Sequence, residues 1–327
     1  MQPFQFSQAT TVDTAIKAQT AGQGRFLAGG TNLIDMMKLD VERPSSLIDI
    51  NDLKLSAITP TPDGGLLLGA LSRNSDVAHH PTVQRDYPVL SQAILSGASP
   101  QLRNMASTAG NLLQRTRCVY FRDTAFPCNK REPGSGCSAI DGFNRSLAIL
   151  GTSKDCIATN PSDQNVALTA LEATIHIQGS SGKRDVPIHN FYVLPGSAPH
   201  IETVLQPGDL ITGVTLPPPR VGVRSVYLKL RDREAYEFAL ASAAVQLGTE
   251  GNRITFARVA LGGVGTRPWR SVEAERALEG RTVDLATFRH AAAEAVRDAH
   301  PQSENAFKVD LAQRCIVRAL TLATNSA

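Results

Sequence analysis

The stretch Phe26-Leu27-Ala28-Gly29-Gly30-Thr31-Asn32-Leu33 decides how the N-terminal part of the chain is built. Arg25–Ala28 is predicted to be a strand, Gly29–Gly30 a tight turn, and Leu33–Leu39 a helix. Such a turn exposes backbone N–H groups at the start of a helix, where a phosphate binds well. Glycine allows the close backbone approach and the positive φ that this needs. The pattern is not the dinucleotide fingerprint GxGxxG, and a plain turn remains the alternative.

A second segment of small residues, Ser107-Thr108-Ala109-Gly110-Asn111, is predicted to be a glycine-containing turn. It combines two hydroxyls and an amide in five residues. Such a loop can line the other side of a phosphate or a ribityl chain. By itself this second motif is too short to decide between a ligand loop and an ordinary turn.

Short strands and helices surround these two segments without any repeat, which predicts an α+β fold. In the N-terminal part we expect helices at 11–18 and 87–95, and strands at 46–50, 66–71, 173–177 and 210–216. Pro217–Pro219 predicts a domain boundary. Beyond it we expect strands near 225–230, 238–247 and 254–261, then helices at 271–278, 285–298 and 304–323. The predicted domains are therefore 1–219 and 220–327.

Composition excludes several classes of protein. The chain has 327 residues with 33 Lys and Arg against 30 Asp and Glu, so its net charge of +3 argues against a nucleic-acid partner. Its sequence holds neither an apolar run long enough to cross a bilayer nor a P-loop. Residues 1–20 do not have the basic and apolar pattern of a secretory signal, so a cytosolic protein is the default expectation.

Four of the five cysteines, Cys118, Cys128, Cys137 and Cys156, are separated by nine, eight and eighteen residues. No CxxC pair is present, which disfavours a zinc finger, and the segment is rich in glycine and proline, which indicates a functional loop. Its cations would favour thiolates; they are Arg115, Arg117, Arg122, Lys130 and Arg131. A [4Fe–4S] cluster is the favoured interpretation, while structural zinc, disulfides and unliganded thiols stay open. Cys315 is predicted to be a core residue.

Further motifs give the chain a family resemblance that covers nearly its whole length. It resembles the FAD-binding subunits of molybdenum hydroxylases, the xanthine dehydrogenase and carbon monoxide dehydrogenase type enzymes. The motifs that carry the resemblance are Phe26–Leu33, Gln101–Asn104 followed by Ser107–Asn111, Asn160–Asp163, and Gly262–Val264 with Pro268–Arg270. Leu112–Cys118 and the loop after it look most similar to the flavin subunits of bacterial periplasmic aldehyde oxidoreductases, which carry an extra [4Fe–4S] cluster.

The resemblance implies a two-part FAD-binding domain of the vanillyl-alcohol-oxidase/PCMH type, with an iron–sulfur insertion at 113–160, and a C-terminal α+β domain of antiparallel sheet and helices. Phe26, Leu27, Ala28, Gly29, Gly30, Thr31, Asn32 and Leu33 would hold the FAD pyrophosphate. Ser107, Thr108, Ala109, Gly110 and Asn111 would form the second FAD loop, in which the family often has glycine where this chain has Ala109. Further FAD contacts are expected from Asp163, Ile211 and Lys229, and the cluster ligands would be Cys118, Cys128, Cys137 and Cys156.

The resemblance also implies partners and an electron relay. A large subunit with a molybdenum cofactor would oxidise an aldehyde or a heterocycle. A small [2Fe–2S] subunit would pass the electrons to FAD in this chain, and FAD would pass them to an external acceptor. We therefore expect a heterotrimer and no catalytic acid or base in this chain.

Several alternatives remain after the resemblance is considered. Hydroxybenzoyl-CoA reductases have a comparable insertion, so the loop alone does not decide the substrate. A xanthine dehydrogenase type complex, a self-contained flavin oxidase and a zinc-stabilised binding module are the others. In the periplasmic relatives the signal lies on a partner subunit, so this chain is expected in the periplasm by co-export or in the cytoplasm.

Overall fold

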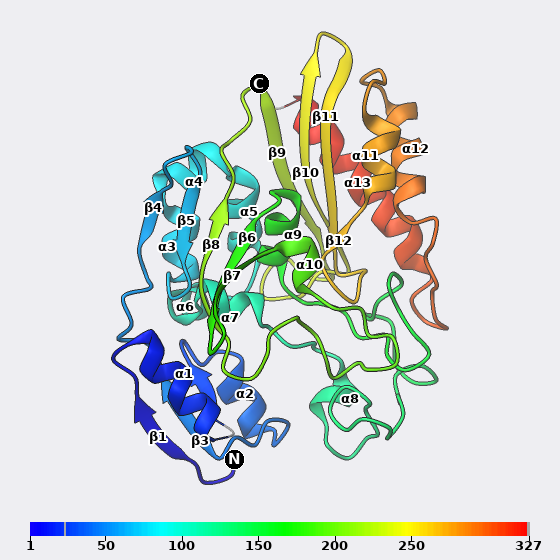
Figure 1. The fold of residues 1–327 in the computed structure, drawn as a ribbon. Helices are drawn as coiled ribbons and strands as arrows, with labels where there is room; N and C mark the ends of the chain where they lie inside the picture. Colours follow the sequence, from blue (N-terminus) through cyan, green and yellow to red (C-terminus); the bar gives the residue numbers. More distant parts are fainter. Residues whose placement is uncertain (23, 326–327) are drawn as a thin grey trace.

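The computed structural model describes residues 1–22 and 24–325, and three sheets organise them (Figure 1). The first is a parallel sheet with the strand order β1 (Gln5–Gln8), β3 (Ser46–Asp49) and β2 (Gly24–Leu27). Its connecting helices are α1 (Val12–Ala21) and α2 (Leu33–Lys38). Thr11 caps α1, because its hydroxyl accepts a hydrogen bond from the Thr14 backbone N–H at 3.1 Å.

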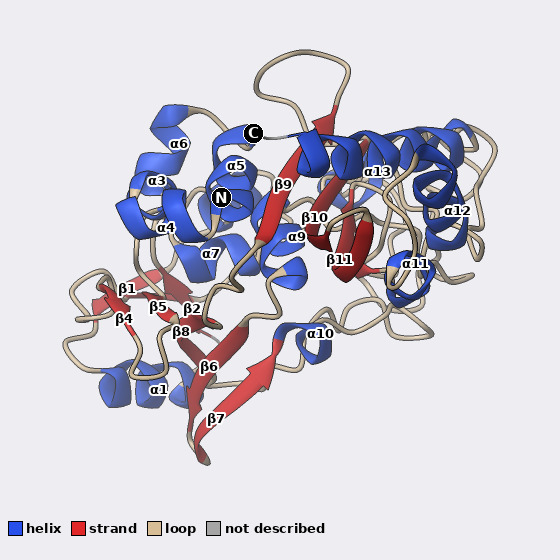
Figure 2. Ribbon diagram, turned by 90° about the horizontal axis from the view of Figure 1, so that it is seen from above, coloured by secondary structure: helices blue, strands red, loops and turns tan. Residues whose placement is uncertain are grey.

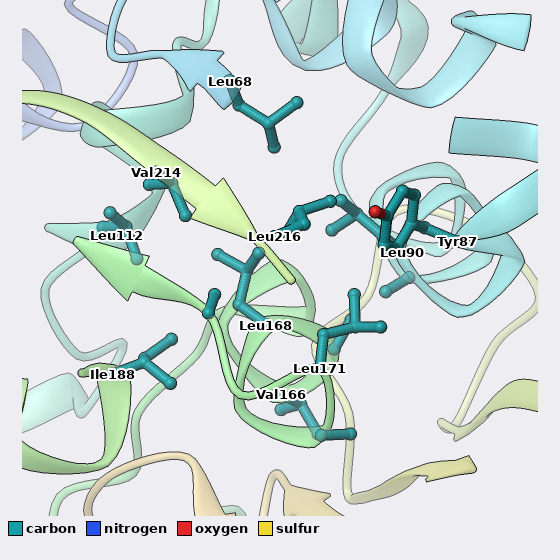
Figure 3. Packing of buried hydrophobic residues seen from close by; sticks show 14 of the residues in the cluster. Leu68, Tyr87, Leu90, Leu112, Val166, Leu168, Leu171, Ile188, Val214 and Leu216 are labelled. Atoms are coloured by element: carbon teal, nitrogen blue, oxygen red, sulfur yellow. The ribbon is translucent and has the colours of Figure 1, made fainter. Parts of the chain in front are cut away.

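The middle sheet has five antiparallel strands and carries the largest hydrophobic core (Figure 3). Its order is β4 (Ile58–Pro60), β5 (Leu66–Gly69), β8 (Leu210–Leu216), β6 (Thr174–Gly179) and β7 (Gly182–Pro187). The alternation along β6 buries Ile175 and Ile177 and leaves Thr174, His176 and Gln178 half-buried. The helices of this region are α3 (Asn74–His79), α4 (Pro81–Asp86), α5 (Pro88–Ser96), α6 (Pro100–Met105), α7 (Thr108–Leu112), α9 (Asp163–Ala170) and α10 (Ile188–Phe191).

The C-terminal sheet has the order β12 (Trp269–Arg270), β11 (Arg253–Gly262), β10 (Ala241–Glu250) and β9 (Val223–Leu230), all antiparallel. Three helices follow: α11 (Val272–Leu278), α12 (Leu285–Ala295) and α13 (Phe307–Asn325). The sheet packs against α5 and α9 on one face and against α11 and α13 on the other (Figure 2). Both faces are covered, so the consecutive residues Ala241–Val245 are all buried.

The cysteine-rich segment, 113–160, lies beside the three sheets and their helices (Figure 1) and contains one short helix, α8 (Val119–Arg122). Its own small core contains Phe121, Leu147 and Ile157 together with the cysteines. Lys308 of α13 connects this segment to the C-terminal helices. Its buried ammonium donates hydrogen bonds to the Ser146 and Leu147 carbonyl oxygens of the segment at 3.0 and 2.8 Å, and to the Gly263 carbonyl oxygen after β11 at 2.5 Å.

The structure confirms the predicted α+β class and corrects several local predictions. Residues 108–112 form helix α7, which Ser107 caps, rather than a turn. Strand β10 begins at Ala241, so the predicted strand start at Phe238 is wrong. Cys315 is fully buried in the C-terminal core, as predicted. No helix in the described ranges has the length and apolar character needed to span a membrane.

Candidate cofactor-binding site

The glycine turn joins β2 to α2 and presses against the end of α6. Gly30 has φ of +72°, a conformation that glycine adopts without strain. A Cβ on Gly29 would come within 1.9 Å of the Met105 carbonyl oxygen. The structure therefore supplies a reason for Gly29 that differs from the expected approach to a ligand: the turn needs glycine there to pack onto the Met105–Ala106 backbone.

The second segment uses its hydroxyls for internal support. Ser107 caps α7 by accepting a hydrogen bond from the Gly110 N–H at 3.2 Å. The Thr108 hydroxyl lies 2.8 Å from that of Ser72, and both are buried. Ala109 packs against the main core. Ser107 and Gly110 are thus the members of this segment that face the cavity formed with the glycine turn.

Two adjoining cavities lie between these elements. The first, of about 490 Å³, is lined by all eight residues of Phe26–Leu33 and by Ser107 and Gly110. The second, of about 570 Å³, includes Asn111, Asp163 and Lys229 in its lining. They share a boundary formed by Thr31, Asn32, Gly110, Gln114 and Pro161. Together they make an extended, two-lobed space of the size that takes a large cofactor.

Asp163 and Lys229 form a buried ion pair in the wall of the second cavity. Lys229 Nζ lies 2.8 Å from Asp163 Oδ2, and their side chains are 3% and 9% exposed. Tyr227 donates its hydroxyl hydrogen to Asp163 Oδ1 at 2.5 Å, and burial together with this carboxylate raises the pKa of Tyr227 well above its usual value. Ile211, by contrast, is buried in the main core and lines neither cavity.

Residues 2–219 match the FAD binding domain in molybdopterin dehydrogenase. Residues 226–323 match the CO dehydrogenase flavoprotein C-terminal domain.

The chain belongs to the FAD-binding medium subunits of the xanthine dehydrogenase and CO dehydrogenase family.

Relatives within this family cover the chain almost completely. The aldehyde oxidoreductase FAD-binding subunit PaoB of Escherichia coli is 49% identical over 334 residues, covering 100% of both chains. The glyceraldehyde dehydrogenase medium chain of Sulfolobus acidocaldarius is 27% identical and covers 92% of this chain and 90% of its own. The carbon monoxide dehydrogenase structure from Hydrogenophaga pseudoflava matches with a TM-score of 0.78 at 24% identity over 99% of each chain, which shows a common fold.

Polar atoms without a partner in the protein lie at the second cavity of this flavin subunit and are suited to pair with FAD. Asn74 Oδ1, Gln164 Oε1 and Arg122 Nη1 are buried without a hydrogen-bond partner in the protein, and all three residues line the second cavity. Buried polar atoms are normally paired, so this lobe suits a ligand with both donors and acceptors, as FAD has. Neither the composition nor the motifs of the sequence had singled out Asn74 or Gln164.

The four clustered cysteines of the flavin subunit all line one small cavity. None is in a disulfide, and Cys128 and Cys137 face each other across an isolated antiparallel bridge. Burial raises the pKa of Cys118 to about 11. Burial also raises the pKa of Cys156, and the Lys130 charge opposes that rise. Among the described residues, no three His, Cys, Asp or Glu side chains are arranged to hold a metal ion.

A chain of ion pairs anchors the cysteine-rich segment to the FAD domain. Arg115 binds Glu42 through Nη1 and Glu202 through Nε, each at 2.5 Å. Lys130 Nζ lies 2.9 Å from the other oxygen of Glu202. Burial disfavours the charged form of Glu202, but Arg115 and Lys130 outweigh it and lower the pKa of this carboxyl. Two of the cations expected in this segment, Arg115 and Lys130, are therefore used to hold the segment in place.

Proposed function

We propose that this chain is the FAD subunit of a molybdenum-containing aldehyde oxidoreductase, and that FAD lies along the two joined cavities. The observation that carries the proposal is the meeting of Phe26–Leu33 with α7 around one space that continues to Asp163 and Lys229. When bound, the flavin accepts electrons singly or in pairs, which suits a junction between redox centres.

The residues of the chain would bind and orient the cofactor and take no part in proton transfer to a substrate. Backbone groups of Phe26–Leu33, with Ser107, Gly110 and Asn111, would surround the diphosphate and its neighbouring groups. Asp163 and Lys229 would form the far wall, while Thr108 and Ala109 support this surface from behind. Ile211 lies in the core, so any effect on FAD would be through packing.

Purification of the chain with its partners tests the FAD assignment directly. We expect a flavin absorption spectrum and one FAD released per chain on denaturation. A colourless chain that does not take up added FAD would contradict the assignment.

We further propose that Cys118, Cys128, Cys137 and Cys156 bind a [4Fe–4S] cluster. All four line one cavity, and none is oxidised to a disulfide. A [4Fe–4S] cluster takes four Cys thiolates, one on each iron, so its ligands surround a volume and need not converge on one ion. Structural zinc is the competing proposal for the same donors.

Metal analysis separates these two proposals. Iron and acid-labile sulfide at about four each per chain support the cluster, while zinc without visible absorption supports the alternative. Cys128→Ser should remove about four iron atoms, and Cys315→Ala, in the C-terminal core, should leave iron unchanged. Unchanged iron in Cys128→Ser would overturn the ligand assignment.

The proposed complex contains a large molybdenum-cofactor subunit and a small [2Fe–2S] subunit, with an external electron acceptor. Support for an aldehyde substrate comes from the named activities of two relatives, an aldehyde oxidoreductase and a glyceraldehyde dehydrogenase. Co-purification of three subunits and reduction of FAD by an aldehyde test this proposal. Fractionation decides between a periplasmic complex exported with its partner and a cytoplasmic one.

We also propose that the domain boundary lies at 219/220, with the insertion at 113–160. The Pro217–Pro219 run supports it, because it directly follows strand β8 and precedes β9 of the next sheet.

A further inference from the structure

Two cavities share part of their wall: the first cavity of the proposed FAD site (the first FAD cavity) and the small cavity lined by the four clustered cysteines (the cysteine cavity). The residues that line both are Lys130, Cys156 and Ala158. Other lining residues of the cysteine cavity, including Cys118 and Cys128, do not reach the first FAD cavity. The wall between the two spaces therefore contains one thiol and one cation. A charge held in this wall is therefore close to both spaces.

Lys130 is held rigidly in that wall. Its ammonium donates hydrogen bonds to the Pro199 carbonyl oxygen and to Glu202 Oε1, both at 2.9 Å, and its side chain is only 10% exposed. Glu202 is held in turn by Arg115, which binds Glu42 of the N-terminal part. The charge of Lys130 cannot swing into water, so solvent screens it weakly.

Glu202 is shared between two cations, so it neutralises Lys130 only in part. The other ionisable groups that line the cysteine cavity are the cysteines themselves and Asp155, which is half-buried. Lys130 is the only Lys, Arg or His among the described residues that line this cavity. A nearby fixed charge in a weakly screened site favours whichever redox state carries the opposite charge.

We propose that the positive charge of Lys130, in the wall shared by the two cavities, stabilises the reduced state of the cluster. Lys130 is thus a positioning residue that favours electron transfer from FAD toward the cluster at Cys156. The inference rests on the proposed cluster. In the proposed step, one electron would pass from the reduced flavin to the cluster, so the flavin would be oxidised by one electron and the cluster would gain one negative charge. No bond between protein atoms forms or breaks.

Three variants of the purified complex test this role, with the reduction potential of the cluster measured by EPR-monitored redox titration. Lys130→Met keeps the side-chain stem and removes the charge. We expect the ratio of reduced to oxidised cluster at a fixed solution potential to fall about tenfold, which for a one-electron couple is about 59 mV. Lys130→Arg should restore most of the wild-type potential. Lys154→Met is the matched control, because Lys154 is exposed although it lies two residues from Cys156, and its potential should not change.

The outcomes separate the inference from the proposed function. Iron-free wild-type complex would overturn the cluster and the inference with it. Wild-type iron with an unchanged potential in Lys130→Met, or with an equal shift in Lys154→Met, would overturn the inference alone. If Lys130→Met does not assemble the cluster, Glu202→Gln decides: it removes the negative charge beside Lys130, so the potential should rise. An unchanged or lowered potential in that variant would overturn the role of Lys130.

Discussion

Lys229 Nζ and Asp163 Oδ2 lie 2.8 Å apart in a buried ion pair that joins β9 of the C-terminal sheet to the first turn of α9. The pair thus connects the FAD domain to the C-terminal domain at the wall of the second cavity. Lys229 also donates a hydrogen bond to the Ser96 carbonyl oxygen at 3.1 Å, at the end of α5. This ion pair therefore contributes both to the stability of the protein and to the wall of the proposed FAD site.

Lys229→Met should destabilise the protein by about 3 kcal/mol, because it leaves the Asp163 carboxylate buried without its cation. The temperature of FAD release, followed by flavin fluorescence, should fall. Arg314→Met is the control, since it breaks only an exposed pair with Asp310 and should cost less than about 0.5 kcal/mol. The double variant Asp163→Asn with Lys229→Met should lose less than the sum of its parts; additive losses would contradict the pairing.

Gly29→Ala should prevent the turn from packing on α6, because its Cβ would lie 1.9 Å from the Met105 carbonyl oxygen. We expect a large loss of bound FAD and a destabilisation of about 1–3 kcal/mol. Gly22→Ala makes a matched control: Gly22 is extended, with φ of −148°, and an added Cβ meets nothing within 4 Å. Full FAD occupancy in Gly29→Ala would show that the turn does not shape the site.

Glu202 should make stability depend on acid pH. Its pKa in the folded protein lies below the usual 4.5, because Arg115 and Lys130 outweigh the effect of burial. Its stabilising contribution is then fully present above pH 4.5 and is lost as pH falls through the lower, folded value. Glu202→Gln should flatten this acid loss in an unfolding titration between pH 6 and pH 3. Parallel curves for the two proteins would rule out the contribution.

Lys308 should make stability rise at alkaline pH. Burial lowers the pKa of Lys308 from 10.5 to about 7 in the folded protein. Between these two values the unfolded chain binds more protons than the folded one, so stability increases with pH by up to about 1.4 kcal/mol per unit. Compared with Lys308→Met, the wild type should gain stability from pH 7 to pH 9.5. A constant difference between the two proteins over that range would disprove the shift.

The sequence by itself determined much of the local structure. The glycine turn, its flanking strand and helix, and the C-terminal order of strands and then helices follow from patterns within a few residues. The clustering of four cysteines in a glycine- and proline-rich stretch also distinguishes that segment in the sequence alone. The sequence also supplied the family, because motifs spread from Phe26 to Arg270 occur in one characteristic order.

Only the tertiary structure decided how these pieces meet. It turned the Thr108 hydroxyl inward to Ser72, placed Gly29 against Met105, and paired Asp163 with a lysine 66 residues away. It also placed Lys130 between two cavities, through contacts with Pro199 and Glu202. Local patterns report which residues favour a turn or a helix, whereas these contacts depend on how distant elements pack to bury apolar surface and pair the polar groups left inside.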